Sequence, residues 1–267
     1  MTFVQAAVLG IVQGFTEFLP VSSSGHLILF PRLFGWADQG SGFDVIVHLG
    51  TLVAVVIFFR KKLWELCKAF FSRSTLLRPE RRIAWLIVLS IIPAGVVGVL
   101  LETNDRSVLV VGISMIVWGI VLGIADWYNK RKIKELKPLT DLLHLKVWQV
   151  ITIACAQAVA LIPGTSRSGI TMTAGLFSGL DKKTAAEFSF LMSVPIIALA
   201  GLNKVIDVVQ NGAGGVESSM LFVGFVASAV SGFIAIAGLM KIIQKWSFLP
   251  FVVYRVVLGV LILALLS

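Results

Sequence analysis

Residues 13–26 read Gln-Gly-Phe-Thr-Glu-Phe-Leu-Pro-Val-Ser-Ser-Ser-Gly-His and place a carboxylate, an amide, hydroxyls and an imidazole in a strongly apolar stretch. A second polar stretch, Pro-Gly-Thr-Ser-Arg-Ser-Gly-Ile-Thr at 163–171, interrupts the apolar pattern in the second half of the chain. Polar backbone at membrane depth is tolerated only where protein or a watery cavity surrounds it. We therefore expect the two stretches to meet and to form one site that handles an anion.

The composition indicates a membrane protein. The 267 residues are 57% hydrophobic and 14% charged, with a mean hydropathy of +0.95, whereas soluble domains are about 25% charged. The apolar residues come in long blocks without strand-like alternation, which predicts an all-α polytopic membrane protein and argues against a β-barrel. The net charge of +9 is typical of basic cytoplasmic loops, so we expect a lipid bilayer and no nucleic acid as partner.

The ends and cysteines of the chain add little. The N-terminus has no basic segment before its apolar residues, so we do not expect a cleaved signal peptide. Cys67 and Cys155 are far apart and support neither a disulfide framework nor a zinc site.

The polar turn at 20–25 predicts that residues 4–30 form two short helices in a re-entrant hairpin. A loop is expected over 31–43, and residues 60–82 are interpreted as a basic loop. Three apolar segments that cross the membrane are expected near 44–59, 83–101 and 107–127.

The second half repeats this plan. Pro163 follows Pro20 by 143 residues, and Ser-Arg-Ser-Gly at 166–169 follows Ser-Ser-Ser-Gly at 22–25 by 144. With one hairpin and three crossings per repeat, the second copy must insert upside down, and such inverted repeats place broken helices at the functional site. The expected organisation is one membrane domain, 1–267, with a first repeat 1–127, a basic cytoplasmic linker 128–146 and a second, inverted repeat 147–267.

The charge distribution predicts the orientation. The segments 60–82, 128–146, 180–186 and 241–245 carry 18 of the 23 Lys and Arg residues. By the positive-inside rule these segments are cytoplasmic, which places both termini in the periplasm.

Glu17 is the first candidate for chemistry, because a carboxylate inside a membrane segment costs roughly 2.5–3.5 kcal/mol and usually faces a cavity or a partner. Gln13 lies one helical turn earlier, on the same face. His26 follows the hydroxyl-rich turn, which favours an acid–base or nucleophilic role over that of a satisfied polar group. His48 and His144 are interpreted as structural, at a helix start and in a basic loop respectively.

Arg167 is the sharpest single candidate. A phosphate needs a planar guanidinium fork, hydroxyl donors and free backbone N–H groups at a helix start, and the 163–171 stretch offers all three. Gly164 and Gly169 are expected to let the backbone approach the anion closely. The alternative is an arginine that only neutralises Glu17. The set of residues suits an amphiphilic anion such as a lipid phosphate or diphosphate.

The motifs at 17–26 and 163–169, with Glu187-Phe-Ser-Phe-Leu and Pro195 behind them, resemble the undecaprenyl-diphosphate phosphatase family of bacterial inner membranes, which is linked to bacitracin resistance. The resemblance spans the whole chain. It implies removal of the terminal phosphate from undecaprenyl diphosphate, dependent on a divalent metal (Mg²⁺ or Ca²⁺) and facing the periplasm. The product, undecaprenyl phosphate, would return to the lipid carrier cycle of peptidoglycan synthesis.

The resemblance also implies residue roles. The family's first motif has Glu or Gln, three further residues and then Glu, so Gln13 occupies the variable position and Glu17 is expected to be the essential carboxylate. Glu17, His26, Arg167 and Ser23 are the expected catalytic residues, with Glu17 and Gln13 at the metal. The nucleophile is His26, Ser23 or water. The expected substrate-binding residues are Gln13, Ser22, Gly164, Thr165, Ser166, Ser168 and Thr171.

Three alternatives stay open at this point. Inverted repeats are typical of transporters, so a flippase for the same lipid is the main rival function. The close glycines at 112, 119 and 123 predict tight helix packing, either within the chain or in a homodimer. Tyr254 and Arg255 either line the cavity or extend to the membrane interface.

Overall fold

A computed structural model describes residues 1–100, 107–133, 142–211 and 216–266, and every element in these ranges is a helix. Five helical stretches are long and apolar enough to cross a membrane: Gly40–Phe58, Arg78–Leu100, Val108–Arg131, Lys182–Leu202 and Ser218–Ile242. The prediction of an all-α polytopic membrane protein is therefore confirmed. The helices are α1 Phe3–Phe18, α2 Ser23–Leu33, α3 Gly40–Phe58, α4 Arg60–Phe71, α5 Arg78–Leu89, α6 Ile92–Leu100, α7 Val108–Ile133, η1 Leu142–His144, α8 Val147–Val159, α9 Arg167–Phe177, α10 Lys182–Asn211, α11 Ser218–Ile242 and α12 Leu249–Leu266.

Two pairs of short helices, α1–α2 and α8–α9, have the same local structure at the joint. The serines that precede α2 and α9, Ser22 and Ser166, have φ values of 74° and 73°, and among the described residues they are the non-glycine residues with positive φ. Each serine hydroxyl caps the following helix by accepting the backbone N–H three residues on, at 3.4 and 3.1 Å. The two turns lie 144 residues apart and share this backbone geometry.

The expected loop over 31–43 is present but shorter, covering residues 34–39. Helix α2 continues through Pro31 to Leu33, and α3 already begins at Gly40. A proline inside a helix leaves the carbonyl four residues earlier without its usual donor. Here the side-chain amide of Gln39 donates to the Leu27 carbonyl at 3.1 Å, so that carbonyl is satisfied and the helix is kept.

The basic segment 60–82 is not only a loop. It contains the helix α4, which buries Leu66 and Ala69 and exposes Trp64, Lys61 and Lys68. Helix α4 packs against α5, where Phe70 stacks on Trp85 at a ring distance of 4.3 Å. Counting charges along the segment hid the apolar face of this amphipathic helix.

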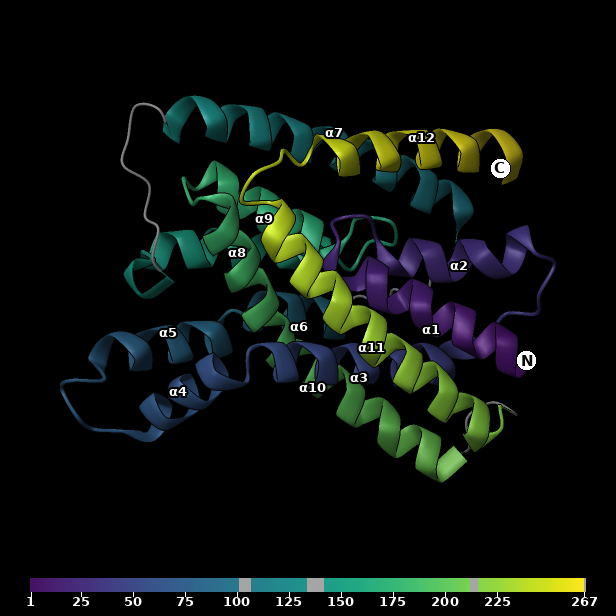
Figure 1. Cartoon of the computed structure of the whole chain (residues 1–267), viewed down its shortest axis with the longest axis horizontal. Helices are drawn as coiled ribbons and strands as arrows, with labels where there is room; N and C mark the ends of the chain where they lie inside the picture. Colours follow the sequence, from purple (N-terminus) through teal and green to yellow (C-terminus); the bar gives the residue numbers. More distant parts are fainter. Residues whose placement is uncertain (101–106, 134–141, 212–215, 267) are drawn as a thin grey trace.

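Figure 1 shows how the helices are placed along one long direction. Both chain termini lie at one end, and the α4–α5 connection and the far end of α7 lie at the other. The expected apolar segment 83–101 is interrupted between α5 and α6 at Ser90 and Ile91. Residues 102–106 and the middle of the predicted linker, 134–141, lie outside the described residues.

The glycines of α7 pack inside the chain. Positions 112, 119 and 123 face Leu263, Arg255 and Val252 of α12, at distances where an added Cβ would contact those side chains. This face of α7 is therefore occupied by α12, which decides the open question of what the glycines contact.

Helices α1 and α11 pack so closely that a side chain at Gly14 has no room. A Cβ at this position would lie 1.9 Å from the Ser231 hydroxyl and 2.6 Å from the Gly232 nitrogen. We expect Gly14→Ala to lower the free energy of unfolding by about 1–3 kcal/mol, because overpacking displaces neighbouring helices. The matched control is Gly238→Ala on α11, where nothing lies within 4 Å. Thermal unfolding in detergent compares the two variants, and equal melting temperatures would contradict this packing.

Candidate active site

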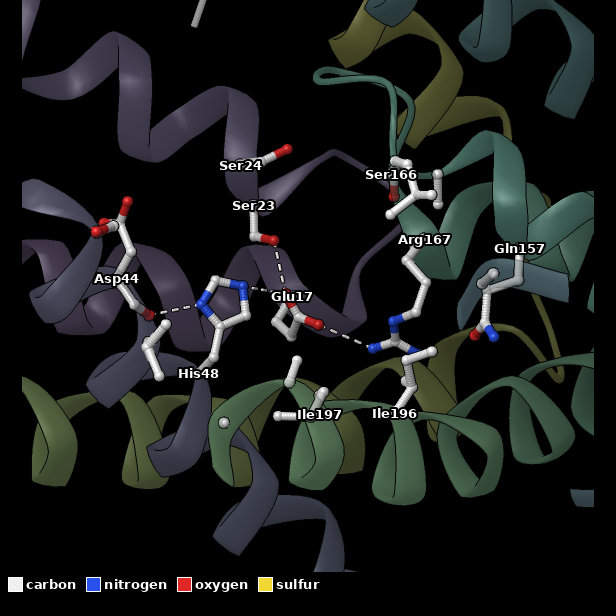
Figure 2. A pocket seen from close by; sticks show the side chains of 17 residues that line it. Glu17, Ser23, Ser24, Asp44, His48, Gln157, Ser166, Arg167, Ile196 and Ile197 are labelled. Atoms are coloured by element: carbon white, nitrogen blue, oxygen red, sulfur yellow. Dashed lines mark hydrogen bonds and ion pairs between the residues drawn. The ribbon is translucent and has the colours of Figure 1, made fainter. Parts of the chain in front are cut away.

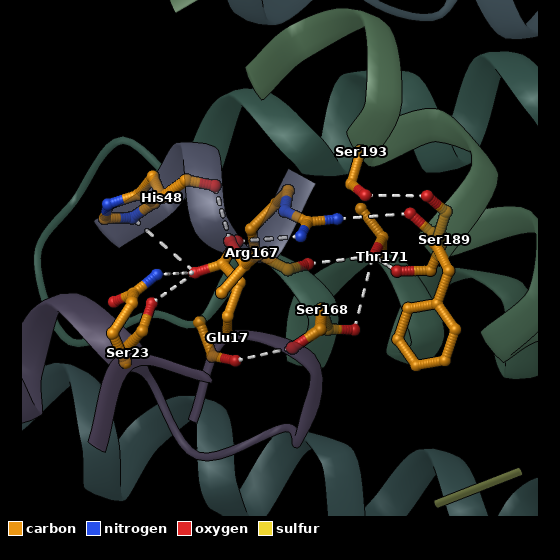
Figure 3. A network of polar contacts seen from close by, with 12 residues as sticks. Glu17, Ser23, His48, Arg167, Ser168, Thr171, Ser189 and Ser193 are labelled. Carbon is orange, nitrogen blue, oxygen red and sulfur yellow. Dashed lines mark hydrogen bonds and ion pairs between the residues drawn. The ribbon is translucent and has the colours of Figure 1, made fainter. Parts of the chain in front are cut away.

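The two polar stretches meet, as expected. Glu17, at the end of α1, accepts a hydrogen bond from Arg167, the first residue of α9, with 2.9 Å between Oε1 and the guanidinium. The ion pair is largely buried, with 6% of the Glu17 side chain and 14% of the Arg167 side chain exposed. Figure 3 shows the pair between the two hairpin turns. A low-dielectric surrounding strengthens this ion pair relative to one in water.

The second oxygen of the Glu17 carboxylate carries two further contacts. The Ser23 hydroxyl donates to Oε2 at 2.6 Å, and the Gln13 side-chain amide donates to the same oxygen at 3.1 Å. Gln13 and Glu17 therefore share one face of α1, as their spacing predicts. The carboxylate lies between a hydroxyl that could lose a proton to it and a guanidinium that balances its charge.

Hydroxyl groups near Arg167 form hydrogen bonds with the backbone and with one another at the start of α9. Thr171 donates to the Arg167 carbonyl at 2.8 Å and shares a 2.7 Å hydrogen bond with the Ser189 hydroxyl. Arg167 itself donates to the Ser189 carbonyl at 3.1 Å. Ser168 joins the hairpins by donating to the Leu19 carbonyl at 3.0 Å (Figure 3). The Ser189 carbonyl thus orients the guanidinium, and the Ser168 and Thr171 hydroxyls anchor the loop.

A pocket of about 380 Å³ opens next to the ion pair. Figure 2 shows Glu17, Ser23 and Arg167 at its polar side. Apolar side chains, among them Ile196 and Ile197, form another part of the wall. A cavity with one cation, one carboxylate, hydroxyls and an apolar wall can hold an anion that carries a hydrocarbon tail.

The structure divides the predicted site residues into two groups. Glu17, Ser23, Ser166 and Arg167 line the pocket. The others are buried and do not line the pocket. They are Gln13, Ser22, His26, Gly164, Thr165, Ser168 and Thr171. For this second group a direct contact with substrate stays a prediction.

The glycines of the second hairpin have a different neighbour from the expected anion. An added Cβ at Gly164, whose φ is 86°, would lie 2.5 Å from the Val111 carbonyl oxygen of α7. A Cβ at Gly169 would lie 2.8 Å from the Arg255 guanidinium. Glycine is required at these positions because helices and an arginine approach the turn.

His26 lies apart from the pocket. Its ring is 2% exposed, Nδ1 contacts the Ser22 carbonyl at 2.7 Å, and Nε2 contacts the Tyr254 hydroxyl at 2.6 Å. The His26 and Tyr254 rings stack at 5.7 Å. Both ring nitrogens are engaged, so the catalytic role of His26 stays a prediction.

His48 is the histidine that lines the pocket, contrary to its interpretation as a structural residue at a helix start. Helix α3 begins at Gly40, so His48 lies more than two turns inside it. Its Nδ1 donates to the Asp44 carbonyl at 2.6 Å, and its Nε2 lies 3.6 Å from Glu17 Oε2 (Figure 2). The missed signal was an ionisable side chain within an apolar span, the same signal that identified Glu17.

The sequence left the place of Arg255 open and gave no role to Gln157. Arg255 is fully buried and donates to five backbone carbonyls, those of Met115, Pro20, Ser114, Gly164 and Thr165, at 2.8–3.5 Å. It therefore neither lines the pocket nor reaches an interface, but joins both hairpin turns to α7. Gln157 lines the pocket from α8 and follows Gln13 by 144 residues, so the repeat offset could have identified it.

The oxygen atoms around Glu17 are compatible with a hard divalent cation. Gln13 Oε1 is buried and has no hydrogen-bond partner, and it lies on the residue whose amide contacts Glu17. Among the described residues there is no cluster of three His, Cys, Asp or Glu side chains that could hold a metal alone. Mg²⁺ is commonly held by one or two carboxylates together with substrate phosphates. The residues present fit such a shared site.

The fold and the site define the class of protein: a polytopic helical membrane protein with a buried carboxylate–guanidinium pair beside a pocket for an amphiphilic anion. A family model described as bacitracin resistance protein BacA matches residues 6–261, and the chain belongs to this family.

The relatives are similar over their whole length. An undecaprenyl-diphosphatase 2 of Stutzerimonas stutzeri is 46% identical over 100% of this chain and 99% of the relative. An undecaprenyl-diphosphatase 1 of Pseudoalteromonas translucida is 43% identical over 100% of both chains. An undecaprenyl-diphosphatase of Hahella chejuensis is 45% identical over 97% of this chain and 96% of the relative.

Proposed function

We propose that the protein is an integral-membrane phosphatase of the bacterial inner membrane that hydrolyses undecaprenyl diphosphate to undecaprenyl phosphate and inorganic phosphate. This activity recycles the lipid carrier for peptidoglycan synthesis and confers bacitracin resistance. The observation that carries the proposal is the Ser23–Glu17–Arg167 arrangement, with contacts of 2.6 and 2.9 Å, at the wall of a partly apolar pocket. Full-length relatives with this activity in their names support it.

The geometry favours Ser23 as the nucleophile. Its hydroxyl hydrogen points at the Glu17 carboxylate, which can take the proton as Ser23 Oγ attacks the terminal phosphorus. The bond from that phosphorus to the bridging oxygen breaks, undecaprenyl phosphate leaves, and water hydrolyses the phosphoserine. Arg167 balances the negative charge that builds up on the phosphoryl oxygens. A phosphoenzyme trapped on His26 instead would contradict this assignment.

A Mg²⁺ or Ca²⁺ ion would add positive charge at the phosphate oxygens. Glu17 and the free Oε1 of Gln13 are the residues that would hold it. The remaining predicted side chains keep positioning roles: Ser168 and Thr171 hold the second hairpin, and Arg255 holds the carbonyls of both turns.

The proposed topology is that of two inverted repeats with re-entrant hairpins. It is supported by the matching serine turns 144 residues apart and by termini at the end opposite the α4–α5 connection (Figure 1). With the basic end in the cytoplasm, both termini are periplasmic. The pocket includes Ser41 and Asp44 from the first turns of α3, which supports access from the periplasm.

Phosphate release from undecaprenyl diphosphate by the purified full chain in detergent tests the proposal. We expect turnover that stops on addition of EDTA and returns with Mg²⁺ or Ca²⁺. A flippase that lacks hydrolytic activity would release no phosphate under these conditions, because detergent micelles have no second leaflet. Absence of phosphate release would therefore overturn the proposed function in favour of transport.

Arg167→Lys is expected to lower phosphate release by about a hundredfold. A lysine keeps the charge but offers no planar fork, so it cannot contact Glu17, the Ser189 carbonyl and a phosphate together. The rate of phosphate release by the purified variant measures the effect. Arg73→Lys, an exposed site on the α4–α5 connection, is the matched control. Full activity of Arg167→Lys would contradict recognition by the fork.

His48→Ala is expected to lower phosphate release by about tenfold, because the imidazole faces the pocket and lies 3.6 Å from Glu17. His144→Ala, in η1 outside the pocket, is the control for loss of an imidazole. Activity of His48→Ala within a factor of two of the wild type would exclude a role for His48.

A further inference from the structure

A second hollow, of about 680 Å³, lies where the ends of α7, α10 and α11 meet. It shares no lining residue with the active-site pocket. Its lining contains five basic side chains, a single carboxylate among the described residues, and two tryptophans. The basic residues are Lys130, Arg131, Lys182, Lys183 and Lys245, the carboxylate is Asp181, and the tryptophans are Trp127 and Trp246.

The nearby carboxylates are already used by the protein. Asp181 caps α10, with its two oxygens accepting the Thr184 backbone N–H and hydroxyl at 2.9 Å each. Asp126, 4% exposed beneath the hollow, pairs with Lys182 at 3.1 Å and Lys130 at 3.4 Å. The carboxylate of Asp181 therefore caps a helix, and that of Asp126 neutralises Lys182 and Lys130.

Lys183 and Lys245 remain available. Both are exposed, and in the part of the chain that the structure describes neither has an ion-pair partner. Arg131 lies over the ring of Trp127 at 4.1 Å, which holds a third cation at the rim. The hollow therefore keeps positive charge that the protein does not neutralise.

The hollow lies at the level of the membrane where lipid head groups are expected. The apolar spans of α7 and α11 end at Arg131 and Ile242, and that of α10 begins at Lys182. The hydrocarbon core of a bilayer ends near the ends of the apolar spans that cross it. Trp127 and Trp246 are 54% and 65% exposed, and exposed tryptophans at helix ends are typical of the membrane–water interface.

We infer that this hollow binds the head group of an anionic glycerophospholipid, with the phosphate on Lys183, Lys245 and Arg131. Basic pockets between transmembrane helices bind anionic lipid head groups on the cytoplasmic side of membranes. In the proposed orientation the lipid comes from the cytoplasmic leaflet, opposite the periplasmic leaflet from which the substrate is proposed to enter. The inference does not depend on the phosphatase activity.

The test measures lipid binding to the purified full chain in a neutral detergent by native mass spectrometry. Phosphatidylglycerol is the probe, and phosphatidylcholine with the same acyl chains is the neutral comparison. The double variant Lys183→Gln, Lys245→Gln is expected to bind phosphatidylglycerol roughly thirtyfold more weakly than the wild type. Its phosphate release without added anionic lipid should equal that of the wild type, which shows that the variant is folded.

The matched control removes two lysines from α4, Lys61→Gln and Lys62→Gln, at the same end of the molecule (Figure 1). It should bind phosphatidylglycerol like the wild type. An equal loss of affinity in both double variants would show that only the total charge matters, and it would overturn the proposed site. Equal affinity for phosphatidylcholine, or displacement of the lipid by millimolar inorganic phosphate, would also overturn it. Arg131→Gln, expected to weaken binding several-fold, provides a second variant.

Discussion

Glu17→Gln is expected to reduce phosphate release about a thousandfold, the largest effect on activity of any single substitution here. The amide cannot accept the Ser23 proton, and it leaves the Arg167 guanidinium, 14% exposed, without its ion-pair partner. Both consequences act on the same step, because the base and the balance of charge are lost together. The measurement is single-turnover phosphate release by purified protein at saturating Mg²⁺.

Glu65→Gln is the control for this substitution, since Glu65 is an exposed carboxylate on α4. It should release phosphate like the wild type. Melting curves in detergent separate a catalytic loss from a folding loss in Glu17→Gln. If the variant melts like the wild type and keeps more than a tenth of the activity, Glu17 is not the base.

Arg255→Met is expected to have the largest effect on stability, about 3 kcal/mol or more. Methionine has a similar volume but no donor, so the carbonyls of Pro20, Gly164 and Thr165 lose their partner in a buried setting, at about 1–3 kcal/mol for each unsatisfied group. Because those carbonyls belong to both hairpin turns, phosphate release should fall with stability. Thermal unfolding and phosphate release of the same preparation test this.

Arg73→Met removes an exposed arginine from the α4–α5 connection and should leave the melting temperature unchanged. Arg255→Lys should recover only part of the lost stability, since one ammonium cannot reach carbonyls on three chain segments. An Arg255→Met protein as stable as the wild type would show that the two turns hold each other without the arginine.

Much of the fold could be predicted because the membrane restricts what the chain can do. Long apolar segments in a membrane must be helices, and their approximate positions followed from the order of apolar residues along the chain. The errors fell where local patterns compete with tertiary contacts. The extension of α2 through Pro31 depends on a donor from Gln39, which comes from outside that helix. The apolar face of α4 was hidden by its three lysines and one arginine.

The candidate site, too, could be predicted from the sequence only in part. Glu17, Ser23 and Arg167 were identified because polar groups in a membrane segment are costly and therefore informative. The same argument applied to His48 would have placed it in the pocket, where it lies 3.6 Å from Glu17. A helix that started at residue 44 would place His48 near its first turn, whereas α3 begins at Gly40. The prediction of one meeting point for both stretches is confirmed by the 2.9 Å ion pair.

The sequence by itself determined the class of the protein and its two polar turns, because hydrophobicity and charge are properties of the residues. It offered the pairing of Arg167 with Glu17 only as an alternative to phosphate binding, and the structure shows that pair. Only the tertiary structure decided which polar side chains face the pocket. His26 and His48 are both histidines in apolar surroundings, yet one contacts Tyr254, 228 positions away, and the other contacts Glu17. Which partner a side chain meets depends on how distant helices pack, and that information is spread over the whole chain.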